Sequence, residues 1–327
     1  MMTKQLCVKT IKLRSISLMA LLIFTQIGFS NNVNATSAVT NNQIVSINEQ
    51  NVYLRFDKNI TPEQQETLHE WVKHSANALT TVYGEFPVDH FITKIKASKR
   101  ISGTVPWGEV DRLQPPEVTL VVNTRRTLAE LKADWTIYHE FSHLLIPYDA
   151  GNERWFSEGL ASYYQNILQA RSGMFTEQKM WQKLYEGLER GRKQSNFSHQ
   201  QLSYVSDHIG SNRNYMRIYW SGALYWLKAD IALRELSSKQ SLDNALKQLR
   251  DCCFDEYLSA KEIVQKLDQI TNSKVFSQLF DEFSKSYQIP DYFSLFKQLG
   301  VTPQNNLIKL NNDATLTNIR RDIFKGQ

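Results

Sequence analysis

The sequence contains few cysteines, and this shortage excludes one class of protein. Only three occur among 327 residues: Cys7 and the adjacent pair Cys252 and Cys253. Disulfide-stabilised proteins need several cysteines spaced along the chain, and neighbouring cysteines bridge each other only through a strained ring. We therefore expect no disulfide framework. We expect Cys252 and Cys253 to be inert thiols of a helical segment, with a vicinal or an intermolecular bond as the alternatives.

A strong net charge is also missing once the first residues are set aside. The formal charge is +5, but residues 1–35 carry four basic residues and no acidic one. The remainder has thirty-four basic against thirty-three acidic residues. Because a nearly neutral chain has no general attraction for polyanions, we expect no nucleic-acid partner.

The sequence lacks an apolar run as long as the roughly 20 residues of a membrane-spanning helix. Its main apolar run, Ser15 to Phe29, is shorter and contains Ser, Thr and Gln. Basic residues precede this run and Val33-Asn34-Ala35 follows it, which is the pattern of a cleaved signal peptide. An uncleaved anchor is the alternative, and Cys7 lies on the wrong side of the run for a lipoprotein. We expect residues 1–35 to be removed on export to the periplasm or extracellular space, with no stable membrane insertion afterwards.

The first half of the remaining chain has mixed periodicity and no internal repeat. Residues 36–50 are predicted to be a solvated lead-in, and residues 102–114 a loop rich in Gly, Pro and Trp. Thr61-Pro62 begins a helix that should end at Gly84. Period-two alternation predicts strands at 51–56, 91–97 and 118–122. Residues 36–126 are thus expected to form a small α/β lobe with an edge strand.

From Thr127 onward the apolar residues recur at helical spacing. The predicted helices are 128–146, 155–170, 176–191, 215–236, 242–249, 260–270 and 274–287, with a short strand at 307–310. Residues 127–327 are therefore predicted to form a mainly helical lobe.

The most informative segment is His139-Glu140-Phe141-Ser142-His143, which lies in one of these helices. Histidines four residues apart share a helical face, so both imidazoles can bind one ion while Glu140 reaches a water on that ion. The surrounding residues are apolar, and burying these polar side chains without a partner would be costly. A metal ion would supply that partner.

A third ligand should come from another element, and Glu158 is the candidate. Together, HEFSH and the segment Trp155 to Tyr164 (WFSEGLASYY) resemble the gluzincin metallopeptidases, in particular the M1 and M61 aminopeptidase-like group of the peptidase MA clan. In that group a zinc-binding glutamate comes from a W-x-x-E-G-x-A-x-Y segment. The resemblance therefore implies that His139, His143 and Glu158 bind one Zn²⁺ per chain.

Two further segments bear on catalysis and specificity. Tyr219 to Ala223 (YWSGA) resembles the family's Y-x-x-G-A segment, whose tyrosine supports the oxyanion, and a phenol can donate a hydrogen bond there without carrying charge. The family's G-x-M-E-N segment, which binds a free amine, is not matched, because Val105 stands where its glutamate would fall. Aminopeptidase specificity therefore does not transfer, although Glu109 or Glu117 could replace that glutamate.

These observations predict an α+β, thermolysin-like zincin with a small mixed α/β N-terminal lobe and a mainly helical C-terminal lobe. Its function would be that of an exported zinc metallopeptidase acting on a peptide or protein. In this reading Glu140 is the general base, Tyr219 stabilises the oxyanion, and the edge strand at Glu117 to Asn123 pairs with the substrate backbone. The histidines' second ring nitrogens could donate to Asp134 or Asp149. Two alternatives remain: a zinc-containing binding or envelope protein without turnover, and a zinc hydrolase of a non-peptide bond.

Overall fold

The computed structural model describes residues 43–326 except 101, 113, 149, 150, 195 and 255, and it leaves the side chain of Asn212 undescribed. The predicted signal peptide therefore lies outside the described residues. Among the helices that are described, none is both long enough and apolar enough to cross a bilayer.

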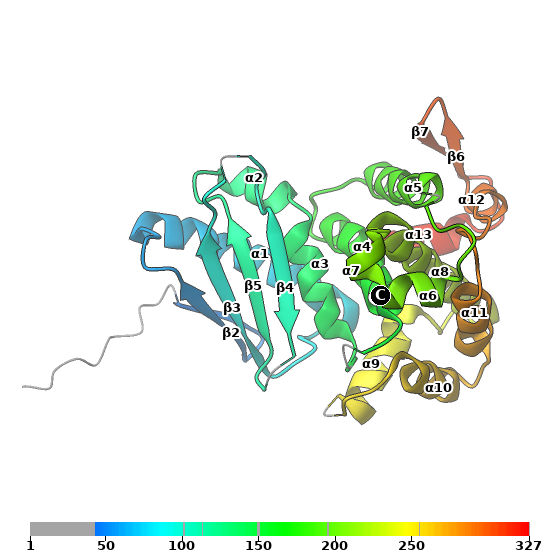
Figure 1. Ribbon diagram of the computed structural model, residues 1–327, viewed down its shortest axis with the longest axis horizontal. Helices are drawn as coiled ribbons and strands as arrows, with labels where there is room; N and C mark the ends of the chain where they lie inside the picture. Colours follow the sequence, from blue (N-terminus) through cyan, green and yellow to red (C-terminus); the bar gives the residue numbers. More distant parts are fainter. Residues whose placement is uncertain are drawn as a thin grey trace, which may run out of the picture. The chain divides into compact units, whose positions relative to one another are not determined.

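A mixed sheet forms the N-terminal lobe (Figure 1). Within the described part of the chain its strand order is β1-β2-β3-β5-β4, with β2, β3 and β5 parallel and both outer strands antiparallel to their neighbours. The strands are β1 (Ile44–Ile47), β2 (Gln50–Phe56), β3 (His90–Ala97), β4 (Trp107–Asp111) and β5 (Glu117–Val122).

The long helix α1 (Pro62–Tyr83) begins and ends where the sequence predicts. Thr61 and Gln64 form a reciprocal capping box at its start, and Gly84 ends it in the left-handed conformation, with a φ of 83°. Its apolar face is buried and contributes Trp71, Val72 and Leu79 to the core. α1 packs against β1 and against the helix that carries the histidines.

Two segments of this lobe differ from the predictions. Residues of the expected lead-in form β1, and the expected loop at 102–114 contains β4. Because β4 is the outer strand, β5 lies inside the sheet, so the prediction of an edge strand at Glu117 to Asn123 is wrong. The sequence did not reveal β4 because an outer strand has little alternation of apolar and polar residues. The side chains of β4 are all exposed or half-buried, whereas those of β5 are mostly buried.

The C-terminal lobe is mainly helical, as predicted. Its helices are α2 (Leu128–Ala133), α3 (Thr136–Ser142), the 3₁₀ turn η2 (His143–Leu145), α4 (Arg154–Arg171), α5 (Glu177–Lys193), α6 (Leu202–Asp207), α7 (Ile209–Asn212), α8 (Tyr215–Leu236), α9 (Leu242–Cys253), α10 (Ala260–Thr271), α11 (Val275–Ser284), α12 (Phe293–Gln298) and α13 (Thr317–Lys325). A hairpin of β6 (Val301–Gln304) and β7 (Leu307–Leu310) joins α12 to α13.

The helix predicted at 128–146 is divided. Asp134 is extended, and its carboxylate accepts hydrogen bonds from the backbone N–H groups of Thr136 (2.9 Å) and Val105 (3.4 Å). These bonds end α2 and restart the chain as α3. The last turn is 3₁₀, and Ile146 is extended before Pro147, as a residue preceding proline prefers.

The prediction of inert thiols at the end of α9 is also wrong. Cys252 and Cys253 are joined by a disulfide, which was the vicinal alternative. Helical spacing does not reveal this bond because it joins successive residues and leaves the apolar pattern of α9 unchanged.

Candidate metal centre and active site

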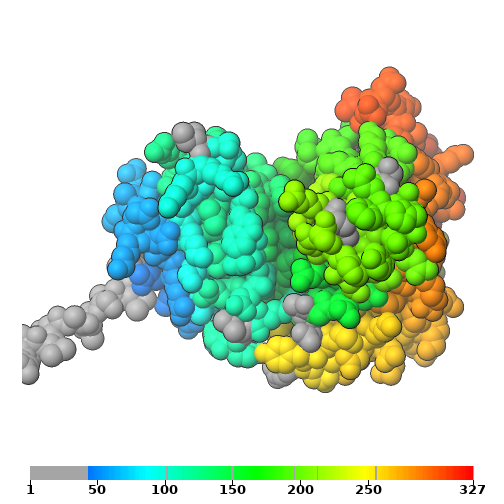
Figure 2. All heavy atoms as spheres, viewed as in Figure 1, coloured from blue at the N-terminus to red at the C-terminus, as the bar shows by residue number. Residues whose placement is uncertain are grey.

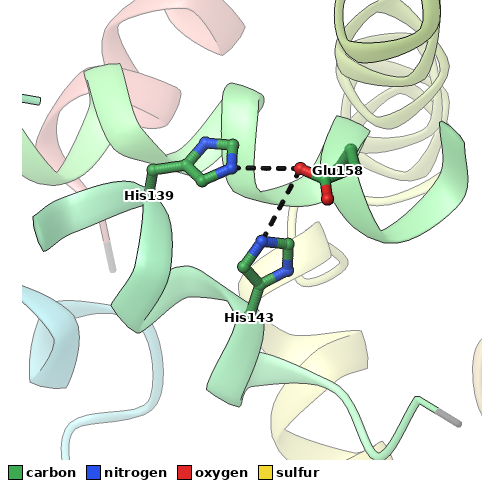
Figure 3. Close-up of side chains that lie close together, drawn as sticks. All are labelled: His139, His143 and Glu158. Atoms are coloured by element: carbon green, nitrogen blue, oxygen red, sulfur yellow. Dashed lines mark hydrogen bonds and ion pairs between the residues drawn. The ribbon is translucent and has the colours of Figure 1, made fainter. Parts of the chain in front are cut away.

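Three side chains from three successive helical segments converge on one point (Figure 3). His139 comes from α3, His143 begins η2, and Glu158 comes from α4. Glu158 Oε2 lies 3.2 Å from His139 Nε2 and 3.7 Å from His143 Nε2. Ligand atoms of a tetrahedral zinc site lie about 3.3 Å from one another, and two imidazoles with one carboxylate are a donor set that zinc accepts. The three residues therefore fit a zinc ion.

Each imidazole is oriented by a side chain of α4. His139 Nδ1 lies 2.9 Å from Gln165 Oε1, and His143 Nδ1 lies 3.0 Å from Ser157 Oγ. Because an amide oxygen only accepts, His139 Nδ1 carries a hydrogen, and Nε2 is the ring nitrogen that faces Glu158. The sequence did not predict these partners: Asp134 binds backbone N–H groups instead, and Asp149 lies outside the described residues.

The electrostatics of the cluster suit a cation. Burial lowers the pKa of His143 to about 3, so this imidazole is neutral. Burial raises the pKa of Glu158, but the hydrogen bond from His139 and the nearby imidazoles outweigh it, so the net shift is downward and the carboxylate is ionised. Burial lowers the pKa of His139, but the neighbouring Glu158 and Glu140 raise it by more, so the net shift is upward. A half-buried, ionised carboxylate beside two ring nitrogens is a favourable place for a positive ion.

Glu140 lies beside this cluster, between the two lobes. Its side chain is buried, and burial is the main reason that its pKa is raised to about 7, with Glu158 and Glu109 adding to the rise. Gly108 of β4 packs directly on it: a Cβ on Gly108 would lie 2.6 Å from Glu140 Cγ. Only glycine at this position leaves room for the carboxylate.

Tyr219 of α8 completes the group of predicted residues. Its ring stacks on the ring of His139, with centroids 5.8 Å apart and an angle of 18° between the planes. Burial is the main reason that the pKa of its hydroxyl is raised, and the charges of Glu158 and Glu140 add to the rise. The phenol therefore stays protonated and can donate a hydrogen bond.

The packing of α4 on α8 sets the position of Glu158 relative to Tyr219. Gly159 and Gly222 face each other, and a Cβ on Gly159 would lie 2.3 Å from the backbone of Gly222. Two glycines thus allow the helix backbones to touch. Glu158 directly precedes one of these glycines, and Tyr219 lies one turn before the other.

The cluster lies in a cavity of about 460 Å³ between the lobes, visible as a hollow between the sheet and the helices in Figure 2. β4 contributes Gly108, Glu109 and Val110 to its wall. Two carboxylates were considered as replacements for the amine-binding glutamate. Glu109 lines this cavity, whereas Glu117 does not and forms ion pairs with Arg55 and Lys94.

Arg112 is a site residue that the sequence did not single out. Its guanidinium donates hydrogen bonds of 2.9 Å to the backbone oxygens of His143 and Ile146, and it lies over the ring of Tyr148. It therefore ties the segment after β4 to the end of the histidine-bearing turn. A lone arginine in a loop carries no sequence pattern that would indicate this contact.

Comparisons with known proteins show a match to one family model and a similarity of fold to solved structures. Residues 147–229 match the family model of M61 glycyl aminopeptidase; this range includes Glu158 and Tyr219 but not the two histidines. An aminopeptidase N family protein from Idiomarina loihiensis is similar in structure, with a TM-score of 0.60 and 16% identity over 80% of this chain and 49% of that chain. An M1 zinc metallopeptidase from Deinococcus radiodurans gives a TM-score of 0.45 and 15% identity over 76% of this chain and 51% of that one. No curated protein matches the sequence.

The chain spans about half the length of the solved structures that it resembles, and at this identity the likeness concerns the fold. The predicted zincin fold, with its small α/β lobe and mainly helical lobe, is confirmed. Residues 147–229 thus resemble the M61 glycyl aminopeptidases, and the fold is shared with the aminopeptidase N family protein, as expected for a gluzincin domain of the M1/M61 aminopeptidase-like group.

Proposed function

We propose that this protein is an exported, zinc-dependent metallopeptidase. The observation that carries the proposal is the convergence of His139, His143 and Glu158 on one point, with Glu140 beside them. A site that only stabilises a fold has no need of a buried carboxylate next to its ligands. A zinc ion in this position would lower the pKa of a bound water and polarise the scissile carbonyl.

The protein's own groups would then divide the remaining work. Glu140 has a pKa near 7, so it can accept a proton from the attacking water and pass it to the leaving amine. Tyr219 remains protonated and would donate a hydrogen bond to the oxygen on which negative charge develops. Glu158 contacts both imidazoles and would bind the metal ion together with them.

The outer strand β4 would align the substrate. It forms part of the cavity wall, it carries the glycine that contacts Glu140, and its free edge can pair with an extended peptide. This proposal replaces the strand predicted from the sequence, because β5 is already paired on both sides.

Export is the second part of the proposal. It is supported by the basic and apolar pattern of residues 1–35. The disulfide between Cys252 and Cys253 supports it as well, since such bonds persist in oxidising compartments. Amino-terminal sequencing of protein recovered from outside the cytoplasm tests it: a start near residue 36 is expected, and an intact leader would contradict cleavage.

The catalytic assignment is tested by separating metal binding from turnover. Glu140→Gln should retain one zinc per chain and lose nearly all hydrolysis of a peptide library, because the general base is gone while the three ligands remain. His139→Ala should lose stoichiometric zinc as well as activity. Elemental analysis and chelator-sensitive cleavage measure the two properties. Glu66→Gln is the matched control, since Glu66 is exposed on α1.

Two results would overturn the assignment. Hydrolysis by zinc-loaded Glu140→Gln protein at the unmodified rate would remove Glu140 as the base. A wild-type protein that binds zinc but cleaves no peptide would favour the alternative of a non-peptide substrate or a binding function.

A further inference from the structure

A second cavity, which we call the side pocket, adjoins the metal centre on the helical side. It has a volume of about 440 Å³, within the range of about 300–1,000 Å³ typical of ligand pockets. It lies between α4, α5 and α8 and is closed at one end by the link between α2 and α3. In Figure 1, α5 lies above α4 and α8, and all three helices pack against one another.

The side pocket and the metal-centre cavity share one lining residue. Tyr219 lines both cavities. Gln165, which orients His139, lines the side pocket, as does Trp135, whose ring lies edge-on to His139 at 5.4 Å. The side pocket therefore lies directly beside the metal centre, on the other side of His139 and Tyr219.

The two cavities differ in their charged residues. The described residues that line the metal-centre cavity include the carboxylates Glu109, Glu140 and Glu158 together with the cations Arg112 and Arg154. Those that line the side pocket include two cations, Lys183 and Arg190, and no carboxylate. A pocket with fixed positive charge and apolar walls favours a side chain that ends in a negative group.

Arg190 is the cation available to a ligand. Lys183 already pairs with Glu186 at 3.0 Å, whereas Arg190 has no hydrogen bond or ion pair with another described residue. Its guanidinium instead lies over the ring of Trp220, 5.2 Å from the centroid. Gly187, one turn earlier, permits this arrangement, because a Cβ there would lie 2.2 Å from the Trp220 ring.

A buried amide supplies a second donor. Gln165 is only 7% exposed, and its oxygen is engaged by His139. Its Nε2 therefore has two N–H bonds to donate, and it has no hydrogen-bond partner among the described residues. An amide donor and an unpaired guanidinium in one pocket match a carboxylate.

We propose that the side pocket selects substrates with a carboxylate next to the scissile bond, bound by Arg190 and Gln165. The inference rests on the proposed peptidase function and adds a substrate class to it. The carboxylate can belong to an acidic side chain or to the substrate's own carboxyl terminus, and the experiment distinguishes these sources.

The test compares matched peptides. In a peptide found to be cleaved, each residue flanking the scissile bond is set in turn to Glu and to Gln, with the carboxyl terminus either free or amidated. For the wild type we expect kcat/KM to be about tenfold higher with Glu than with Gln at one flanking position, because a hydrogen bond to a charged group is worth about that factor. The preference should weaken at high salt. A preference for the free carboxyl terminus alone would assign the pocket to that group.

Arg190→Gln should bring the Glu-to-Gln ratio close to one. Arg192→Gln is the control: it removes the same charge from the same helix, but Arg192 lies outside the side pocket and belongs to an exposed ion pair with Glu189. The control should keep the wild-type ratio. Cleavage without preference for any carboxylate, or an unchanged ratio in Arg190→Gln, would overturn the inference while leaving the peptidase proposal intact.

A binding measurement tests the inference separately from turnover. The Glu and Gln peptides are titrated into Glu140→Gln protein in a calorimeter. We expect the Glu peptide to bind about tenfold more tightly, and we expect Arg190→Gln, added to this protein, to abolish the difference. Equal affinities would contradict the side-pocket proposal independently of turnover.

Discussion

At the scale of single residues, Tyr219 shows why a polar group near the metal centre has to be neutral. Burial and the nearby carboxylates of Glu158 and Glu140 raise the pKa of its hydroxyl, so it acts as a hydrogen-bond donor at physiological pH. A charged donor would instead form a stable ion pair with Glu158 and would compete with a metal ion for it. The phenol can stabilise developing negative charge without this competition.

Tyr219→Phe isolates the hydroxyl from the ring. We expect kcat to fall by a factor of about 10²–10³, the usual cost of losing one oxyanion donor, while the zinc content stays at one per chain. The stacking on His139 is retained because the ring remains. Steady-state kinetics with elemental analysis measure both effects.

Tyr215→Phe is the matched control for this variant. Tyr215 lies one turn earlier on α8, is exposed, and meets the Tyr219 ring edge-on at 6.3 Å. It should retain wild-type kcat. A normal kcat in Tyr219→Phe would rule out the oxyanion role.

At the scale of helices and strands, the crossing of α4 and α8 couples the fold to the site. The glycines that let these backbones touch lie close in sequence to the functional residues. Gly159 directly follows Glu158, and Gly222 is one helical turn beyond Tyr219. A wider crossing would move Tyr219 away from Glu158. The glycines therefore serve the site as well as the packing.

Gly222→Ala is expected to force the two helices apart. The added Cβ would lie 2.0 Å from the backbone oxygen of Trp155, and such overpacking costs about 1–3 kcal/mol or more in the free energy of unfolding. Urea denaturation should show this loss, and kcat should fall with it because Tyr219 moves away from Glu158. Gly210→Ala is the control, since a Cβ there meets nothing within 4 Å. If Gly222→Ala matched this control in stability and activity, the backbone contact would not matter.

The sequence predicts the elements whose determinants are local. α1 has its capping box and terminal glycine, α8 has a continuous apolar pattern with the predicted bounds, and His139 and His143 are placed together by helical spacing alone. Glu158 was placed by a family resemblance, and the structure brings it to the same point.

The missed features depend on contacts between distant residues. β4 is a strand because it pairs with β5, and its exposed side chains give little alternation. The break at Asp134 depends on the backbone of Val105, and the partners of the imidazoles come from α4. None of these contacts is encoded by the periodicity of the segment in which it occurs.

At the scale of the whole molecule, both lobes hold the histidine-bearing segment. β4 packs Gly108 against Glu140, and Arg112 binds the backbone at His143 and Ile146. On the opposite side, Tyr83 of α1 donates a hydrogen bond to the backbone oxygen of Leu145. The ligands are thus positioned by the sheet lobe, α1 and α4 together, so the site exists only when the complete domain is folded.

Zinc should consequently stabilise the entire domain. A ligand that binds the folded state alone adds about 2.7 kcal/mol at a free concentration of 100 times its Kd. The three ligand residues span His139 to Glu158 and lie in separate helical segments, so unfolding disperses them. We expect the wild-type Tm, measured by circular dichroism, to rise with buffered free zinc and to fall when a chelator removes the metal. His139→Ala should show neither change, which separates this site from weak surface binding. If the wild-type Tm did not depend on zinc, the folded domain would bind the ion no more tightly than the unfolded chain does. The convergence of the three side chains would then need another explanation.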